Sequence, residues 1–492
     1  MTRSYRLALT GDVIMNTRVS ACRDPDVLAA VDLLRTADVT HAHLEIPLHD
    51  FDRADIFGAA EGALAWYRGP TAIADELRWL GVDVVSTASN HSLDYSYGGL
   101  RSTCSALDAA GLAHAGTGAD LAAARAPAFA DTAAGRVALV SATSSFPSFA
   151  RAGAARTDAA GRPGVNPLRY FNVIDPATAG RLISIVAALG LGVVRDTGSG
   201  EFVIHPPGLH NTTWRFRVAD GDDPATTRCD ESDLAGNLES IRYARSVSDL
   251  VIAHLHVQAW DGADGRMSSS PAFAHEFGRA AAGVGAAVVL IQGAHAPIRG
   301  IEVHAGVPIL YDPGPLFRLG RREAQPHDFY TRWGNDARVR SFDAGLLDAF
   351  GARDTALGRG AGKDGAVKNG AVKNEAVKDG GDKNGGDKNG GDKNGGGKSG
   401  GDAKVTLSPR EGYNHEPGFF VPVCEVDAAT HRLTRVNLHP MTWSRTSRAT
   451  NGFPIRATGA AAEAILDRVA ELSAPYGTRV SVADGIGRVT VE

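Results

Sequence analysis

Apolar runs and helix-like runs alternate along the first part of the chain, from residue 6 to about residue 145. Short apolar runs are typical of buried strands, and the segments between them have the spacing of amphipathic helices. Strands are expected over residues 5–13, 39–48, 82–90 and 136–144, and helices over 24–37, 71–81 and 98–111. Because helices of this length between strands require crossover connections, the pattern predicts a mainly parallel, buried sheet.

The alternation returns after a less regular middle region. Residues 146–245 contain turn-rich loops, with one expected helix and one expected strand. We interpret this region as an insertion over the edge of the sheet, acting either as a lid or as an element that selects the substrate. Beyond it, strands are expected over residues 248–257, 286–295 and 306–314, and a helix over 271–285.

Between about residues 360 and 402 the composition collapses to Gly, Lys, Asp and Asn, and a short unit repeats nearly verbatim. This stretch has no aromatic residue and almost nothing to bury, so it is predicted to be disordered. A charged interaction tether and a neutral repeat expansion both fit this composition, and the neutral expansion is favoured. Strand-like and helix-like runs follow it, over 412–427 and 458–477.

The predicted fold class is therefore an α/β sandwich of largely parallel sheets flanked by helices. The expected units are a main domain over 1–350 with its 146–245 insertion over the active edge, a disordered insertion over 355–403, and a C-terminal α+β segment over 404–492 packed on the main domain.

Composition narrows the classes of protein that fit. The net charge of -5 is spread along the 492 residues, so nothing indicates binding to nucleic acid or an anionic membrane. The four cysteines lie far apart and form no C-x-x-C motif, which is typical of buried thiols in a reducing compartment. The N-terminal apolar run is too short for a signal peptide, and no segment approaches the ~20 apolar residues of a membrane span. We expect a cytoplasmic protein without a membrane span.

Polar side chains gather where the expected strands end. They are Asp12, Glu45, Asn90, His91, His254, His256 and His295, with His41 and His43 close before Glu45. In open α/β sheets this edge is where ligands bind. Oxygen and imidazole donors are typical ligands of borderline-hard divalent metals, and thiolates are absent from these strand ends. Because His254 and His256 are two residues apart on a strand, they share one face.

These residues predict a divalent metal centre of one or two ions, with Mn, Fe, Zn and Mg as the candidates. Such a centre would activate a water for attack on a phosphoryl or acyl group. His91 could act as a general acid or stabilise developing charge, and it could equally fix its loop by hydrogen bonding. Arg162 and Arg169 in the loop "GRPGVNPLRY" suit a carboxylate or phosphate, although exposed arginines usually have no such task.

Six motifs occur in an order that resembles the CapA family. They are "GDVIM", "HLEIPL", "NHSLDYSYGGL", "AGTGADLAAARAP", "SDLVIAHLHV" and "IRGIEVHAGVPILYDPG". This family comprises bacterial capsule (poly-gamma-glutamate) biosynthesis proteins related to calcineurin-like metallophosphatases. The resemblance covers residues from about 5 to 320, apart from the middle insertion, and implies a metallophosphatase-like layered sandwich.

The resemblance also implies roles for single residues. Asp12 matches the family's Gly-Asp position, Glu45 its Asn-Leu-Glu glutamate, Asn90 and His91 its Asn-His pair, and Asp94 the aspartate that follows. His256 matches the histidine of the family's His-Trp-Gly, with His254 as the second choice, and His295 resembles the second histidine of its His-Gly-Pro-His. The implied metal ligands are therefore Asp12, Glu45, Asn90, His254, His256 and His295, and the implied catalytic residues are His91 and Asp94.

The chain departs from the family pattern at four places. His43 stands where the family has Asn, Ser89 replaces the first Asn of Asn-Asn-His, Gln292 replaces a histidine, and "GPL" at 314–316 replaces Gly-Asn-Phe. These departures predict a weakened metal position and leave two functions open. One is a metal-dependent hydrolase acting on a phosphoester or amide of a small anionic or polyglutamate-like substrate. The other is a non-catalytic capsule-assembly or polyglutamate-binding component, and a tailoring enzyme is a third, weaker interpretation.

Overall fold

The computed structural model describes most of the chain outside the low-complexity stretch. The described residues are 4–60, 65–133, 135–195, 200–205, 214–219, 226–259, 269–294, 298–318, 324–333, 349–351, 353–354, 418–445, 447 and 449–491. The predicted disordered insertion at 355–403 lies outside them.

The first large sheet combines both ends of the chain. Its order is β21-β22-β19-β18-β1-β2-β3-β4, and β20 pairs with β19 at the side. The strands are β1 (Ser4–Val13), β2 (Val39–Leu44), β3 (Val84–Ser86), β4 (Ala113–Ala115), β18 (Phe419–Asp427), β19 (Leu433–Trp443), β20 (Pro454–Arg456), β21 (Ser481–Ala483) and β22 (Ile486–Thr490). Strands β1 to β4 are parallel, as the sequence pattern predicted, whereas β18 joins β1 in antiparallel orientation.

The second large sheet has the order β16-β17-β15-β14-β7-β6. Its strands are β6 (Ala128–Thr132), β7 (Gly135–Thr143), β14 (Leu250–His256), β15 (Val288–Gln292), β16 (Gly300–His304) and β17 (Val307–Tyr311). The four central strands are parallel, and the edge strands β6 and β16 are antiparallel to their neighbours.

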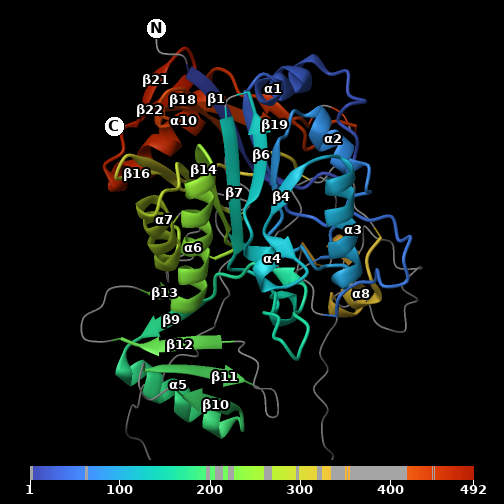
Figure 1. Ribbon diagram of the computed structural model, residues 1–492, viewed down its shortest axis with the longest axis vertical. Coiled ribbons are helices and arrows are strands. Elements are labelled where there is room, and N and C mark those ends of the chain that lie inside the picture. The colour runs from blue at the N-terminus through green and yellow to red at the C-terminus, as the bar shows by residue number, and fades with distance from the viewer. Residues whose placement is uncertain are drawn as a thin grey trace, which may run out of the picture.

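The two large sheets pack face to face, and helices cover their outer faces (Figure 1). The helices are α1 (Pro25–Arg35), α2 (Ile73–Trp79), α3 (Ser96–Ala109), α4 (Leu121–Arg125), α5 (Pro176–Ala188), α6 (Glu231–Val247), α7 (Ala272–Gly283), α8 (His327–Arg332) and α10 (Ala460–Ser473). Helices α1 and α2 pack on the first sheet, and α6 and α7 on the second. This arrangement confirms the expected layered α/β sandwich with helices on its flanks.

Strand β1 shows why this sequence builds four layers, which are helices, the first sheet, the second sheet and helices again. Leu7 and Leu9 point into the core between the sheets, and Ala8 points to the core under the helices. All three are fully buried, because a parallel strand covered on both faces needs apolar residues at every position. Helix α1 begins where Asp24 accepts a hydrogen bond from the Asp26 N–H and Pro25 takes the first helical position.

Residues 146–245 divide between two parts of the molecule. A five-stranded sheet of order β10-β11-β12-β9-β13 carries α5 and lies at one end of the molecule (Figure 1). Its strands are β9 (Tyr170–Ile174), β10 (Gly192–Arg195), β11 (Glu201–His205), β12 (Trp214–Val218) and β13 (Thr227–Cys229); a further pair joins β5 (Thr117–Gly118) to β8 (Gly164–Val165). Helix α6, from the same region, instead packs on β7 and β14 and buries Ile241 and Ala244.

The C-terminal segment is built into the main sandwich. Strands β18 and β19 extend the first sheet beyond β1, and α10 packs on β16 and β19. The described part of the expected 404–492 segment thus contributes strands to the sheet that carries β1. No helix in the described part of the chain combines the length and apolar character needed to span a bilayer.

A bulge in β1 decides which way Asp12 points. The register to β2 pairs Leu9 with His41 and Asp12 with His43, so β1 holds one extra residue between these two pairs. Without the extra residue, the alternation of side chains would turn Asp12 away from the core between the sheets. A Cβ atom at Gly11 would lie 1.7 Å from the Gly314 carbonyl oxygen, so only glycine fits in the bulge.

Gly11→Ala should destabilise the protein by at least about 1–3 kcal/mol, because the new methyl group has no room. Denaturant unfolding measures the loss. Gly180→Ala is the matched control, since nothing lies within 4 Å of its added Cβ on α5. The control should keep or raise stability by up to about 1 kcal/mol. Equal stability of the Gly11 variant and the unchanged protein would contradict the close packing at the bulge.

Candidate metal centre

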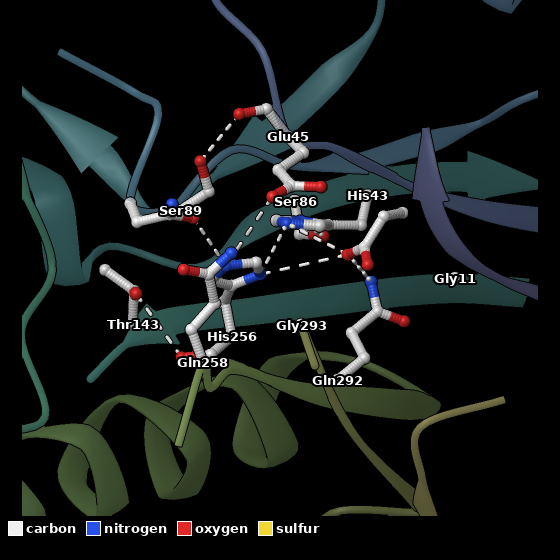
Figure 2. A network of polar contacts seen from close by, with 12 residues as sticks. Gly11, His43, Glu45, Ser86, Ser89, Thr143, His256, Gln258, Gln292 and Gly293 are labelled. Carbon is white, nitrogen blue, oxygen red and sulfur yellow. Dashed lines mark hydrogen bonds and ion pairs between the residues drawn. The ribbon is translucent and has the colours of Figure 1, made fainter. Parts of the chain in front are cut away.

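Three buried side chains from three strands converge at the end of the sandwich where β1, β2 and β14 end. Asp12, His43 and His256 each offer a ligand atom, and these atoms all lie within 4.8 Å of one another. His43 Nε2 is 3.1 Å from His256 Nδ1 (Figure 2). Each of these nitrogens is 3.8 Å from Asp12 Oδ1. All three side chains are at most 2% exposed. The face-to-face packing of the sheets brings β14 of one sheet against β1 and β2 of the other.

The second ring nitrogen of each histidine also has a partner. His43 Nδ1 lies 2.9 Å from Ser86 Oγ, and His256 Nε2 lies 2.8 Å from Asn90 Oδ1. When these outer nitrogens carry the proton and donate it, the inner nitrogens keep their lone pairs. Histidine ligands of metals almost always donate their other N–H in this way.

The three-atom group fits a divalent cation. Bonds of about 2.0–2.2 Å around a tetrahedral ion place neighbouring ligand atoms roughly 3.3 Å apart, close to the separations of 3.1 and 3.8 Å found here. Two imidazoles and a carboxylate suit Zn, Fe or Mn better than Mg, which prefers oxygen ligands. Gln292 also donates from Nε2 to Asp12 Oδ1 at 3.2 Å, and its buried Oε1 has no hydrogen-bond partner among the described residues. Because Nε2 is the atom that faces Asp12, that oxygen could serve as a further ligand only with the amide turned over.

Glu45, His91 and Asp94 adjoin the three-residue group. Glu45 Oε1 lies 4.0 Å from both His256 Nε2 and His91 Nε2. His91 Nδ1 lies 2.7 Å from Asp94 Oδ2, which also accepts a hydrogen bond from the Tyr67 N–H. Burial raises the pKa of the Asp94 carboxyl, and the neighbouring His91 opposes that shift. Asp94 thus holds the His91 ring so that Nε2 faces Glu45.

His254 precedes His256 by two residues on β14 and lies farther from the end of the strand. Its ring centroid is 4.4 Å from that of His43 and 5.6 Å from that of His41, and its Nδ1 is 3.0 Å from Ser141 Oγ. Burial lowers the pKa of His41 to about 3 and that of His254 well below its ordinary value. Of the two histidines on β14, His256 belongs to the three-residue group and His254 packs behind it.

The two arginines expected to bind substrate lie in different surroundings. Arg169 forms a two-pronged ion pair with Asp233, with distances of 2.6 and 3.0 Å, so its charge is already compensated. Arg162 is exposed and donates from Nε to the Arg151 carbonyl oxygen. His295, expected to be a metal ligand, lies outside the described residues.

The sequence interpretation did not include His43 among the metal ligands. It named His43 among the polar side chains near a strand end and then as a departure from the Asn of the family pattern. A signal was nevertheless present, because His41-x-His43 on β2 repeats the spacing of His254-x-His256 on β14. Two such strands facing each other across a sandwich bring their imidazoles together, but only the packing of the sheets shows that they do face each other.

The fold and this group of side chains define the class: an α/β sandwich protein with a buried Asp/His/His group that could bind a metal at its strand ends. The family model described as "Bacterial capsule synthesis protein PGA_cap" matches residues 6–317. The chain belongs to this family, which confirms the resemblance read from the sequence motifs.

Two full-length relatives come from Sinorhizobium fredii (strain NBRC 101917 / NGR234). They are "Uncharacterized protein y4sH" and "Uncharacterized protein y4uA", each 28% identical over 492 residues, covering 99% of this chain and 93% of the relative. The similarity therefore extends well beyond the region that the family model matches.

Acid should destabilise the metal-free protein partly through His41. The folded-state pKa of about 3 lies below the ordinary value of 6.5, so the stability from the neutral ring is complete above about pH 6.5 and is lost as the pH falls toward 3. His41→Leu should reduce the pH slope of the unfolding free energy between pH 6 and 4 by roughly 1.4 kcal/mol per pH unit. Denaturant unfolding with a chelator measures it.

The exposed His327 provides the control, because its side chain meets water in both states. His327→Gln, unfolded under the same conditions, measures the effect of replacing a histidine at the surface. A His41→Leu slope equal to that of the unchanged protein would show that the ring is not held neutral by burial.

Proposed function

We propose that this protein is a metal-dependent hydrolase that acts on a phosphoester or amide of an anionic substrate. The observation that carries the proposal is the buried convergence of Asp12, His43 and His256 with Glu45 and His91 beside it. Membership of the capsule synthesis family supports an anionic, polyglutamate-like substrate. A cytoplasmic location, expected from the sequence, stays a prediction.

A divalent ion held by Asp12, His43 and His256 would polarise the scissile phosphoryl or acyl oxygen and lower the pKa of a bound water. Glu45 supplies carboxylate oxygens next to this position, with Oε1 4.0 Å from His256 Nε2, so a second ion fits the same hypothesis. Asn90 contributes by accepting the Nε2 proton of His256, which fixes the ring with Nδ1 turned inward.

His91 is the residue best placed to move a proton. Its Nδ1 is bound to Asp94 at 2.7 Å, so Nε2 is the atom that faces the centre, 4.0 Å from Glu45 Oε1. From there, Nε2–H can donate to a leaving group or to developing negative charge. Asp94 acts as the positioning residue, because it holds the tautomer that His91 needs.

The arginines in and near the loop of residues 151–169 are the groups that would bind an anionic substrate. Arg125, Arg169 and Arg215 form ion pairs with Asp230 and Asp233, and Arg151 lies near these residues with Arg162 beside it. Burial lowers the pKa of Arg151, and the neighbouring arginines lower it further, while Asp233 opposes the shift. The backbone of this loop hydrogen-bonds to Thr143, which pairs with His256 in the sheet. That an anion held by Arg151 and Arg162 would reach the metal centre is part of this proposal.

One observation favours a non-catalytic alternative. Gln292 takes the place of a family histidine and donates a hydrogen bond to Asp12 Oδ1, the same atom that would bind the ion. A capsule-assembly or polyglutamate-binding component with a degenerate metal site would show this feature. A hydrolase needs Asp12 for turnover. A polymer-binding component keeps its binding when Asp12 is replaced.

Asp12→Asn should abolish stoichiometric binding of Mn, Fe or Zn and lower kcat/KM by at least about 100-fold, because a ligand of the centre is lost. Metal analysis after repletion and a panel of phosphoesters and glutamyl amides measure both quantities. Asp131→Asn is the control, since Asp131 is a surface partner of Arg136 and is 73% exposed. Absence of bound metal in the unchanged protein would refute the hydrolase, and polyglutamate binding that survives Asp12→Asn would support the alternative.

Arg151→Ala and Arg162→Ala should each raise KM for an anionic substrate by about tenfold with kcat little changed, because a charge-assisted contact of about 1.4 kcal/mol is lost. Arg156→Ala is the matched control in the same loop, where Arg156 is already paired with Asp158 at 2.9 Å. Steady-state kinetics at two salt concentrations test the prediction. A KM that rises equally in the Arg156 variant would mean that the effect is not specific to the arginine cluster.

A further inference from the structure

Each large sheet contributes a pair of histidines and a serine to the core between them. On β2, His41 and His43 both contact Ser86 of β3, and on β14, His254 contacts Ser141 of β7 while His256 pairs with Thr143. The rings of His43 and His254 contact each other across the core at a centroid distance of 4.4 Å. Only His43 and His256 reach the three-residue metal group, so the other members need a different explanation.

Ser86 occupies a central position in this arrangement. Its Oγ lies 2.9 Å from His43 Nδ1 and 3.0 Å from His41 Nε2, while the Ala42 carbonyl oxygen is farther away at 3.5 Å. Ser86 is directly opposite His43 in the β2–β3 register, which fixes the short contact. A hydroxyl has one proton and two lone pairs, so Ser86 can donate to at most one imidazole, and it can accept from both when its proton goes to the Ala42 carbonyl oxygen.

Three arrangements of these hydrogen bonds remain. In the first, His41 Nε2–H donates to Ser86, Ser86 donates to His43 Nδ1, and the proton of His43 occupies Nε2, where it blocks a cation. In the second, His43 Nδ1–H donates to Ser86 and Ser86 donates to His41 Nε2. In the third, both imidazoles donate to Ser86, which donates to the Ala42 carbonyl oxygen. The second and third make His43 a metal ligand, because the lone pair of its Nε2 faces Asp12 and its Nδ1–H donates to Ser86.

We propose that Ser86 and His41 are positioning residues for the metal centre, which hold His43 in the tautomer that exposes Nε2 to the ion. The inference rests on the metal site of the proposed function and goes beyond it by naming residues that do not touch the ion. Such partners of ligating histidines typically account for about 10–100-fold in metal affinity.

The burial of His41 supports this role. The ring is fully buried, and its Nδ1 has no hydrogen-bond partner among the described residues. A buried polar atom without a partner destabilises the folded state, so a leucine here would be more favourable for folding alone. The imidazole of His41 can hydrogen-bond to Ser86, and an apolar side chain could not.

The second sheet provides a matched control. Ser141 Oγ lies 3.0 Å from His254 Nδ1, but His254 is not part of the three-residue group. The ligand on that sheet, His256, is oriented by Asn90 instead. Removing the hydroxyl of Ser141 therefore disturbs an equally buried histidine–serine pair without altering the tautomer of a ligand.

The experiment is a titration of the full-length, metal-free protein with Co²⁺, followed by its visible absorption and by competition with a chelator. Ser86→Ala should weaken Co²⁺ binding by about 10–100-fold and change the absorption spectrum, because His43 no longer holds one tautomer. Ser86→Thr, which keeps the hydroxyl, should restore affinity and spectrum. Ser141→Ala should bind Co²⁺ within about threefold of the unchanged protein.

The possible outcomes separate this inference from the proposed function. If the unchanged protein binds Co²⁺ and Ser86→Ala binds it equally well, the positioning role is wrong and the metal centre stands. An equal loss in Ser86→Ala and Ser141→Ala also overturns the role, because general damage to the core then explains both. If the unchanged protein binds no Co²⁺, the metal centre and the positioning role fail together. Should Ser86→Ala not fold, Ser86→Cys allows the same comparison with a weaker hydrogen-bonding group.

Discussion

The face-to-face packing of two largely parallel sheets is the constraint on which the site depends. Because each sheet ends its parallel strands at the same edge, β1 and β2 present Asp12 and His43 to β14, which presents His256. The one-residue bulge at Gly11 adjusts the phase of β1, so that its acidic side chain points into the space between the sheets. An apolar core holds both sheets in place immediately behind these side chains.

Burial gives this edge its chemical character. A carboxylate and imidazoles removed from water destabilise the fold unless they are hydrogen-bonded or share a cation. Here Ser86 hydrogen-bonds to His43, Asn90 to His256 and Gln292 to Asp12. These bonds leave one ligand atom of His43, His256 and Asp12 directed inward. The same bonds that stabilise the buried groups also orient them for a metal, so stability and proposed function rest on the same contacts.

Much of the fold could be read from single strands and helices. The apolar runs at 5–13 and 248–257 became β1 and β14, and the strand-end positions of Asp12 and His256 followed from the same runs. Helix α6 was missed because its exposed face is rich in charge, and only contact with β7 and β14 makes it part of the sandwich. The compensation of Arg169 by Asp233, 64 residues away, could not be read from the loop that contains the arginine.

The sequence by itself determined the layered α/β class, the family, and the kinds of atom that gather at the strand ends, because period and residue type are local properties. The tertiary structure decided which of these atoms meet. It selected His256 over His254 for the three-residue group and brought in His43, since that choice depends on the register between strands and on the bulge at Gly11. Distances between residues 213 positions apart, such as His43 and His256, are set by the packing of two sheets and by no pattern within either strand.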